Sequence, residues 1–301
     1  MTFPAHHHGL RRTGLSTVLV LAATLLASCA SVPRAGRPTD AGTSGPSTGS
    51  TTFDPTTLVG SWTVDGADDE RSGTVLQVDT ALALWRACGE ITFSYIVGPD
   101  GDLHVGGWQT AADACRENRD AAWLVGAVRV EGSRDVVRLL AADGTTTATL
   151  HRGGTPQVDA DAPPGLAAPP VLTPELRDAL EWSPLRLPEG VLAATAEDLV
   201  AGRWVPVDPP ETDPDGSWAE FAADGTWKGT DGCNQSEGLW VLATDGELHT
   251  TSGATTLIGC DGVAVNSWIT AARMVGTSDP GGSLILFGDD GTELGRLVRA
   301  R

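Results

Sequence analysis

The sequence has few basic residues. It contains 20 Lys and Arg against 39 Asp and Glu, which gives a formal net charge of −19 at pH 7. Proteins that bind nucleic acid or anionic lipid headgroups do so through clustered Lys and Arg, and a strongly acidic surface repels both ligands. The charge balance therefore predicts no nucleic acid among the partners of this protein.

An apolar run of membrane-spanning length is also missing. The longest such run, Leu15 to Leu26, is about a dozen residues, whereas a helix needs roughly 20 to cross a bilayer. Arg11 and Arg12 precede the run, and small residues follow it. A charged start, an apolar centre and a small-residue cleavage site are typical of a signal peptide. We therefore expect residues 1–28 to be removed on export.

The tetrapeptide Leu26-Ala27-Ser28-Cys29 ends this segment. It matches the lipobox, in which a diacylglyceryl group is attached to the thiol before cleavage makes Cys29 the first residue. Two acyl chains anchor a protein stably, since each buried methylene contributes about 0.8 kcal/mol. Cys29 is therefore predicted to be a lipid anchor on the extracytoplasmic face of the cell membrane. The alternative is an incidental cysteine beside a simple cleavage site.

Residues 29–57 are rich in Ser, Thr, Gly and Pro and contain almost no large apolar side chain. This composition is typical of a flexible spacer, so we expect a lipid-anchored tether that holds the folded part away from the membrane. The remaining chain is longer than a typical domain of about 100 to 150 residues. Its length suits two domains.

An internal repeat supports that number. Offset by 145 residues, the chain aligns with itself at the following pairs: Cys88 with Cys233, Cys115 with Cys260, Asp100-Gly101 with Asp245-Gly246, Leu103-His104 with Leu248-His249, and Trp123 with Trp268. So many matches in one register indicate a tandem duplication. We expect one domain over 58–152 and another over 199–301, joined by a Pro- and Ala-rich connector over 153–198.

Each copy is predicted to contain several short strands, tight turns and one helix. In the second copy, strands joined by Asp-Gly turns are expected at 218–221, 226–228, 239–243, 247–250, 284–287 and 294–298. Apolar residues at steps of three and four predict a helix over 266–275, capped by Asn266. In the connector, Thr173-Pro174-Glu175 predicts the capped start of a short helix.

No reaction centre stands out in the sequence. It has no Gly-x-Ser-x-Gly segment of the kind that presents a nucleophilic serine. The matched His104 and His249 are expected to face solvent, and the acidic clusters at 65–70 and 208–215 lack the spacing of a calcium loop and are expected to be solvated. We predict no catalytic residue, cofactor or metal site. The alternative is an enzyme that processes envelope glycan or peptide with carboxylates that no motif marks.

Four cysteines remain beside Cys29, and they allow three pairings. Because each copy has to fold as its own unit, we favour Cys88 with Cys115 and Cys233 with Cys260, in an exported compartment that permits oxidation. A four-cysteine zinc site would normally need cysteines two to four residues apart, and the spacing here is wide. Free buried thiols are the other alternative.

Ten tryptophans stand against one tyrosine. Trp62 and Trp204 occupy matched positions within strand patterns, as core residues do. Exported proteins also stack sugars on exposed indoles. Trp85, Trp108 and Trp218 have no tryptophan at the matched position and are the better candidates for such a surface.

The second copy contains Gly225-Thr226-Trp227, Gly232-Cys233-Asn234, Gly238-Leu239-Trp240 and Thr255 to Cys260. This pattern resembles the META domain family, the HslJ-like heat-shock proteins, from Leu199 to the C-terminus. The resemblance implies an α+β module in which a strongly curved antiparallel sheet packs on one short helix. It also implies an envelope or secreted setting with links to heat stress and drug tolerance, and it brings no agreed catalytic activity.

The first copy resembles the family chiefly through its match to the second, and Gly-Cys-Asn has become Ala87-Cys88-Gly89 there. Asn234 is thus a distinctive polar residue that one copy keeps. It either holds a turn by bonding nearby backbone or belongs to a ligand-facing loop beside the disulfide. The function we expect is that of a non-catalytic, membrane-anchored envelope lipoprotein that binds an unknown envelope ligand or protein, or maintains the envelope under stress.

Overall fold

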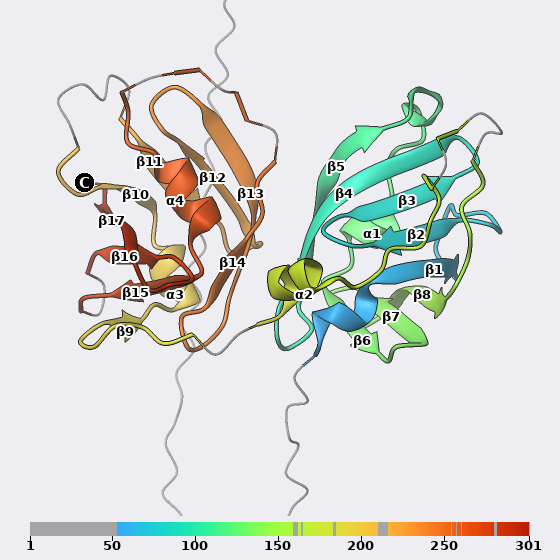
Figure 1. Cartoon of the computed structure of the whole chain (residues 1–301), viewed down its shortest axis with the longest axis horizontal. Helices are drawn as coiled ribbons and strands as arrows, with labels where there is room; N and C mark the ends of the chain where they lie inside the picture. The colour runs from blue at the N-terminus through green and yellow to red at the C-terminus, as the bar shows by residue number, and fades with distance from the viewer. Residues whose placement is uncertain are drawn as a thin grey trace, which may run out of the picture. The chain divides into compact units, whose positions relative to one another are not determined.

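A computed structural model describes residues 53–300, apart from 159–161, 164, 183–184, 210–215, 254, 257, 260 and 280–281. The described chain is mostly antiparallel sheet with a few short helices, and its strands form two curled sheets (Figure 1). The predicted signal peptide, the predicted anchor Cys29 and most of the predicted tether lie outside the described residues.

The first sheet has eight strands in the order β5-β4-β3-β2-β1-β8-β7-β6. The strands are β1 Gly60–Asp65, β2 Val75–Val78, β3 Leu82–Arg86, β4 Gly89–Val97, β5 Leu103–Ala111, β6 Arg129–Gly132, β7 Val136–Leu140 and β8 Thr146–Arg152. The accompanying helices are η1 Pro55–Leu58, η2 Asp113–Cys115 and α1 Ala122–Val125. The helix η1 begins inside the segment predicted as tether, and its Pro55 and Thr56 are buried.

The second sheet has nine strands in the order β14-β13-β12-β11-β10-β17-β16-β15-β9. The strands are β9 Leu192–Ala193, β10 Arg203–Pro206, β11 Trp218–Phe221, β12 Thr226–Thr230, β13 Gln235–Leu242, β14 Leu248–Thr250, β15 Met274–Thr277, β16 Leu284–Phe287 and β17 Glu293–Arg299. The helices are α3 Ala196–Leu199 and α4 Val265–Ala271, and α4 packs against β11, β12 and β17 (Figure 1). Apart from the added β9, the strand order is the same as in the first sheet.

Both sheets curl far enough for distant strands to meet, β5 with β6 in the first sheet and β14 with β15 in the second. In the first sheet, the backbone nitrogen of Leu103 donates to the carbonyl of Val128 at 2.9 Å. In the second, Leu248 makes the same bond to Arg273, also at 2.9 Å. The two bonds join residues that differ by 145 in number, so each sheet closes at the same point.

A glycine shapes the turn before each closure. Gly101 and Gly246 have φ values of +83° and +90°, which favour glycine because it lacks a Cβ. A Cβ on Gly101 would lie 2.7 Å from the carbonyl oxygen of Val130, and one on Gly246 would lie 2.8 Å from that of Val275. The Asp-Gly pairs seen in the sequence are therefore needed both for the turn and for the close approach of the opposite strand.

The largest buried side chains lie at matched places in the two cores. Trp62 and Trp204 are both 0% exposed. The indole of Trp62 donates to the carbonyl of Leu58 at 2.7 Å, and that of Trp204 donates to the carbonyl of Leu199 at 2.8 Å. Each tryptophan thereby ties its sheet to the short helix that precedes it, η1 or α3. The prediction that these two tryptophans belong to the core is confirmed.

The helix predicted over 266–275 is wrong at both ends. Helix α4 ends at Ala271, because Met274 and Val275 are needed in β15, which pairs with β16. Ala264 is the N-cap residue, and Asn266 lies within the helix with its amide directed at the carbonyl of Asn234, 2.9 Å away. The side chain of Asn266 therefore makes a tertiary hydrogen bond and does not cap the helix.

Two side chains expected at the surface of the first sheet are buried. Trp85 is 5% exposed, and its indole donates to the amide oxygen of Gln77 at 3.0 Å. Glu70, from the acidic cluster expected to be solvated, has a side chain only 4% exposed and forms an ion pair with Arg86. The indole of Trp123 also donates to Glu70 at 2.8 Å. Charge is tolerated there because a cation and several donors surround the carboxylate.

The predicted connector contains helix α2 Pro174–Leu180, and the last residues of the connector form β9 and the start of α3. Thr173 caps α2 as predicted, with its hydroxyl oxygen accepting from the backbone nitrogen of Leu176 at 3.2 Å. Just beyond the helix, the indole of Trp182 donates to the carbonyl of Val97 in β4 at 2.9 Å. The connector is therefore packed on the first sheet at this point.

Candidate ligand-binding cleft

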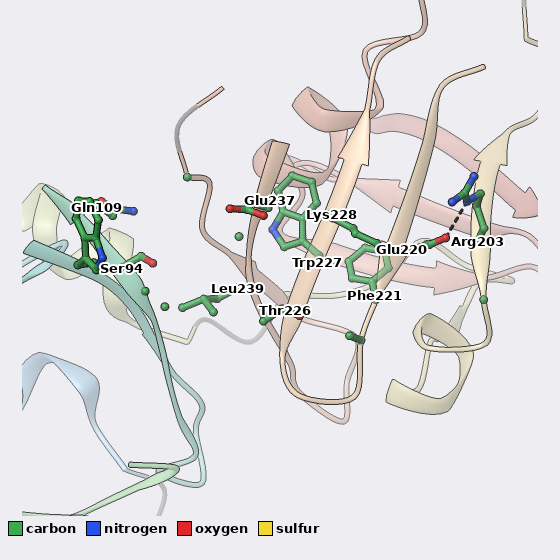
Figure 2. A pocket seen from close by; sticks show the side chains of 17 residues that line it. Ser94, Gln109, Arg203, Glu220, Phe221, Thr226, Trp227, Lys228, Glu237 and Leu239 are labelled. Carbon is green, nitrogen blue, oxygen red and sulfur yellow. Dashed lines mark hydrogen bonds and ion pairs between the residues drawn. The ribbon is translucent and has the colours of Figure 1, made fainter. Parts of the chain in front are cut away.

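A cleft of about 740 Å³ lies between β4 and β5 on one side and β10 to β13 on the other. Figure 2 shows side chains of both walls directed into it, with Glu237 and Leu239 of β13 pointing towards Ser94 and Gln109. Pockets that hold small ligands commonly measure roughly 300–1,000 Å³, and they are found preferentially where two folded units meet. The size and position of the cleft therefore suit a small ligand.

An apolar cluster next to the cleft holds the two walls together. Ile96 of β4 packs with Leu239 and Val241 of β13, and all three are less than 9% exposed. Trp182 packs against this cluster from the connector. Leu239 belongs both to the cluster and to the cleft wall. Packing between these apolar side chains therefore holds β4 and β13 against each other beside the cleft.

The wall formed by β5 is irregular and rich in glycine. The register between β4 and β5 shifts on both sides of Phe93, opposite the cleft residues that run from Gly106 to Gln109. Such bulges re-aim side chains and are often found near functional sites. Here Trp108 is 42% exposed and lines the cleft, while the guanidinium of Arg119 lies 4.5 Å from the centre of its ring. Trp108 is the exposed aromatic group of the cleft.

Charged side chains form ion pairs on the other wall. Glu220 of β11 accepts from Arg203 of β10 at 2.8 Å and lies 2.9 Å from the ammonium of Lys228 of β12. Hydrogen bonds from Lys228 and then Arg203 lower the pKa of Glu220 below its ordinary value. The guanidinium of Arg203 also lies 4.1 Å from the ring centre of Trp218. Both basic side chains of this wall, Arg203 and Lys228, therefore already interact with neighbouring groups.

Three polar side chains of the cleft are left for a ligand. Ser94 and Gln109 lie on one wall, and Glu237 lies on the other (Figure 2). Among the described residues, no hydrogen bond or ion pair engages the hydroxyl of Ser94, the amide of Gln109 or the carboxylate of Glu237. A cleft with a few convergent polar groups on an otherwise apolar lining is the usual form of a specific small-molecule site.

Two glycines of the cleft have different roles. A Cβ on Gly238 would lie 1.9 Å from the carbonyl oxygen of Thr251 and 2.7 Å from the indole nitrogen of Trp227, so only glycine fits there. Gly107 has no left-handed φ, and nothing lies within 4 Å of the place where its Cβ would be. A larger side chain at Gly107 would therefore enter open space in the cleft without a clash.

Asn234, proposed from the sequence as either a turn residue or a ligand-facing residue, is 7% exposed. Its amide nitrogen donates to Asp231 at 3.0 Å and to the carbonyl of Ile258 at 2.8 Å. Its amide oxygen accepts from the hydroxyl of Thr256 at 2.8 Å and from the backbone nitrogen of Ile258 at 2.7 Å. The side chain is fully engaged in holding two loops together, and it does not line the cleft.

The cysteines are consistent with a disulfide in each copy. Cys88 and Cys115 form a disulfide in the first, with a sequence separation of 27. Cys233 is also disulfide-bonded. Its predicted partner, Cys260, lies outside the described residues, so that pairing stays a prediction.

His249 was expected to face solvent, and that expectation is wrong, because the side chain is 8% exposed. Its imidazole stacks on Trp182 with the ring centres 3.8 Å apart and lies 2.9 Å from the carboxylate of Glu247. Burial lowers the pKa of His249 below its ordinary value of 6.5, and Arg273 adds to this, while the bond to Glu247 opposes it. The connector, which supplies Trp182, covers this histidine.

No helix among the described residues is long and apolar enough to cross a bilayer. No group of three or more His, Cys, Asp or Glu side chains among them is arranged to hold a metal ion.

The sequence pointed to one wall of the cleft and missed the other. Trp108 was singled out because it lacks a tryptophan partner in the repeat, and it is exposed and lines the cleft. Glu220 and Glu237 gave no signal, because scattered charges on strands of an acidic protein are common. The Gly106-Gly107 pair was an available clue, since glycine inside a strand often marks a bulge or a close approach.

The chain was compared with protein families, curated proteins and solved structures. No protein-family model, no curated protein and no solved structure matches this chain.

Proposed function

We propose that this protein is an exported, non-catalytic lipoprotein that binds an envelope ligand through the cleft. In this proposal the lipid on Cys29 holds the protein at the outer face of the cell membrane, and residues 29–52 act as the tether, because Phe53 and η1 pack on the first sheet. The folded part consists of two META-like modules of α+β type, which arose by duplication. A role in envelope maintenance under stress would follow from the ligand that is bound.

The duplication is supported by the agreement between sequence and architecture. Residues aligned at an offset of 145 occupy equivalent strands, as the closure bonds of Leu103 and Leu248 illustrate. The META-like assignment rests on the motif around Gly232-Cys233-Asn234 and on the curled antiparallel sheet that carries it.

The cleft is the observation that carries the binding function. It combines a suitable volume, an exposed indole and three polar side chains without partners among the described residues. Glu220 is unsuited to the role of the acid in a hydrolase. A glycosidase of the two-carboxylate type needs an acid whose pKa is raised, whereas Lys228 and Arg203 lower the pKa of Glu220.

The test is thermal unfolding of the mature lipoprotein, from Cys29 onward in detergent micelles, against a panel of envelope glycans, lipids and peptides. A ligand at about 100 times its dissociation constant should stabilise the folded state by roughly 2.7 kcal/mol. Gly107→Leu should abolish the shift by filling the cleft. Gly259→Leu is the matched control, because Gly259 also has open space around its Cβ position but lies outside the cleft. A panel without any shift, or a shift that survives Gly107→Leu, would contradict the proposal.

The anchor has a separate test. Mass spectrometry of the mature protein should find a diacylated Cys29 at the N-terminus, and Cys29→Ala should release the protein from the membrane fraction. An unmodified N-terminus on a membrane-free protein would contradict the lipoprotein assignment and leave the cleft proposal standing.

A further inference from the structure

We infer that the cleft takes an uncharged oligosaccharide, whose sugar ring stacks on Trp108 while its hydroxyl groups bond to Ser94, Gln109 and Glu237. This inference rests on the proposed binding function and names the class of ligand. It follows from three properties of the cleft: its aromatic surface, the donor and acceptor groups on its two walls, and its charge.

The aromatic surface suits a pyranose ring. The C–H face of a sugar is apolar and flat, so it packs on an indole much as another ring does. Trp108 offers such a surface because it is 42% exposed at the cleft. The guanidinium of Arg119 lies over the ring, 4.5 Å from its centre, and Arg119 itself does not line the cleft. An aromatic group held in place loses little conformational entropy when a ligand binds.

The polar groups suit hydroxyl groups. A sugar hydroxyl both donates and accepts, and so do the Ser94 hydroxyl and the Gln109 amide, whereas the Glu237 carboxylate only accepts. These side chains lie on opposite walls, and Glu237 points across the cleft towards the other two (Figure 2). A ligand with hydroxyl groups on several edges can reach both walls at once.

The charges disfavour ionic ligands. Arg203 and Lys228 both form ion pairs with Glu220, and the guanidinium of Arg119 lies over the ring of Trp108, so each of these cations already interacts with a neighbouring group. Glu237 and a net charge of −19 repel anions further. A cationic ligand would meet Arg119 at the indole that it needs for stacking. An uncharged, polyhydroxylated ligand avoids each of these costs.

An extended peptide is the competing occupant. The edge of β13 cannot accept one at Glu237 and Leu239, because Gly253 and Thr251 already donate to their carbonyl oxygens at 2.7 and 2.9 Å. Addition of a strand to β5 is the other route, and the experiment separates it from sugar binding.

The experiment is isothermal titration calorimetry of the mature lipoprotein in micelles with uncharged probes, namely triacetylchitotriose, cellotriose and maltotriose. The comparison probes are trigalacturonate, chitosan trimer and a ten-residue peptide of alternating Val and Thr. We expect at least one uncharged trisaccharide to bind, with an affinity that is unchanged between low and high salt because no net charge is involved.

Three variants test the contacts. Trp108→Ala should weaken binding at least tenfold, and Trp108→Phe should restore part of the loss because a ring remains. Gly107→Leu should abolish binding, and Gly259→Leu should leave it unchanged. Glu237→Gln should change the affinity for an uncharged sugar less than threefold, since the amide oxygen still accepts. The same change would lower the affinity for a cationic ligand more than tenfold.

Each outcome decides between the two proposals. Failure of every uncharged sugar to bind, or binding that is indifferent to Trp108→Ala, overturns the saccharide inference. Binding of the peptide that Gly107→Leu abolishes overturns it too, but supports the proposed function. Absence of any binding that depends on Gly107 overturns both.

Discussion

The two sheets tie the same pair of loops together with different chemistry. In the first sheet, the guanidinium of Arg86, at the end of β3, donates to the carbonyl oxygens of Asn118 and Asp120 in the loop before α1. Glu70 neutralises this arginine from a third segment, and the ion pair is almost fully buried. A charged pair therefore joins these segments of the first sheet.

In the second sheet, the residue at the position of Arg86 is Asp231. It accepts from the backbone nitrogens of Cys233 and Asn234 at 2.9 and 2.6 Å, so it orders the turn after β12. The link to the loop before α4 is made by the neutral amide of Asn234, which bonds to Ile258 and Thr256. The matched position in the first sheet is Gly89, whose φ is +123° and which has no side chain to make such a link.

The comparison shows that the strand order determines which loops have to be joined. It does not determine whether an ion pair or a neutral amide joins them. Breaking the two links should have unequal consequences. Removing one partner of a buried ion pair leaves a charge without compensation, whereas removing an amide leaves a few polar groups that can turn to water. The first sheet should therefore be the more sensitive of the two.

The largest effect is expected from Arg86→Leu. The carboxylate of Glu70 would remain buried without its cation, so the free energy of unfolding should fall by about 3–5 kcal/mol. Urea unfolding checks this, and the double variant Glu70→Met/Arg86→Leu should recover most of the loss. The control is Arg138→Leu, which breaks an exposed pair with Glu131. Equal effects of Arg86→Leu and the control would mean that the buried pair does not hold the loops.

Loss of the disulfide should come next. Cys88 and Cys115 close a loop of about 28 residues, for which the chain-entropy model gives roughly 3.5 kcal/mol. The variant Cys88→Ala/Cys115→Ala should lower the free energy of unfolding by about that amount, measured under non-reducing conditions. Addition of a reductant should then have no further effect on the first sheet, as hydrogen exchange of its amides would report.

Asn234→Ala should destabilise the second sheet by about 1–3 kcal/mol, because it removes the bonds to Asp231, Thr256 and Ile258. Asn118→Ala, in the corresponding loop of the first sheet, is the control, because its side chain is exposed and the hydrogen bonds described for it use its backbone. Calorimetric melting separates the two variants. An unchanged melting temperature for Asn234→Ala would contradict the role assigned to this residue.

The smallest effect concerns acidification, which should weaken the second sheet before the first. Burial lowers the pKa of His249, so the unfolded chain takes up this proton at a higher pH than the folded chain. The stability from neutral His249 is complete above pH 6.5 and is lost as the pH falls through the lowered pKa. Burial opposes ionisation of Glu70, but hydrogen bonds from Arg86 and Trp123 outweigh this effect and lower its pKa. The stability that ionised Glu70 contributes is therefore lost only below pH 4.5.

Melting temperature measured against pH checks this order. His249→Phe keeps a ring beside Trp182 and should remove the slope that begins below pH 6.5, at about 1.4 kcal/mol per unit of pKa difference. His151→Phe is the control, because His151 is exposed. A slope that persists in His249→Phe would assign the acid sensitivity to another group.

Local sequence signals predicted many elements well. The strands at 218–221 and 284–287 have the predicted bounds, and the capped helix at Thr173 begins where the Thr-Pro-Glu signal indicated. These succeeded because alternation of apolar residues and the chemistry of caps act within a few residues. The predicted helix over 266–275 failed at its C-terminal end because β15 pairs with β16, and helical periodicity within one segment cannot reveal that pairing.

By itself, the sequence determined the periodic and repetitive features of this protein. The offset of 145 residues, the core tryptophans and the pairing of Cys88 with Cys115 all follow from patterns along the chain. Only the tertiary structure decided which polar groups are buried and which meet in the cleft. Glu70 and His249 are covered by segments distant in sequence, and Trp108 and Glu237 face one cleft because packing at Ile96 brings β13 against β4. Burial and proximity depend on contacts between distant segments, which no local pattern encodes.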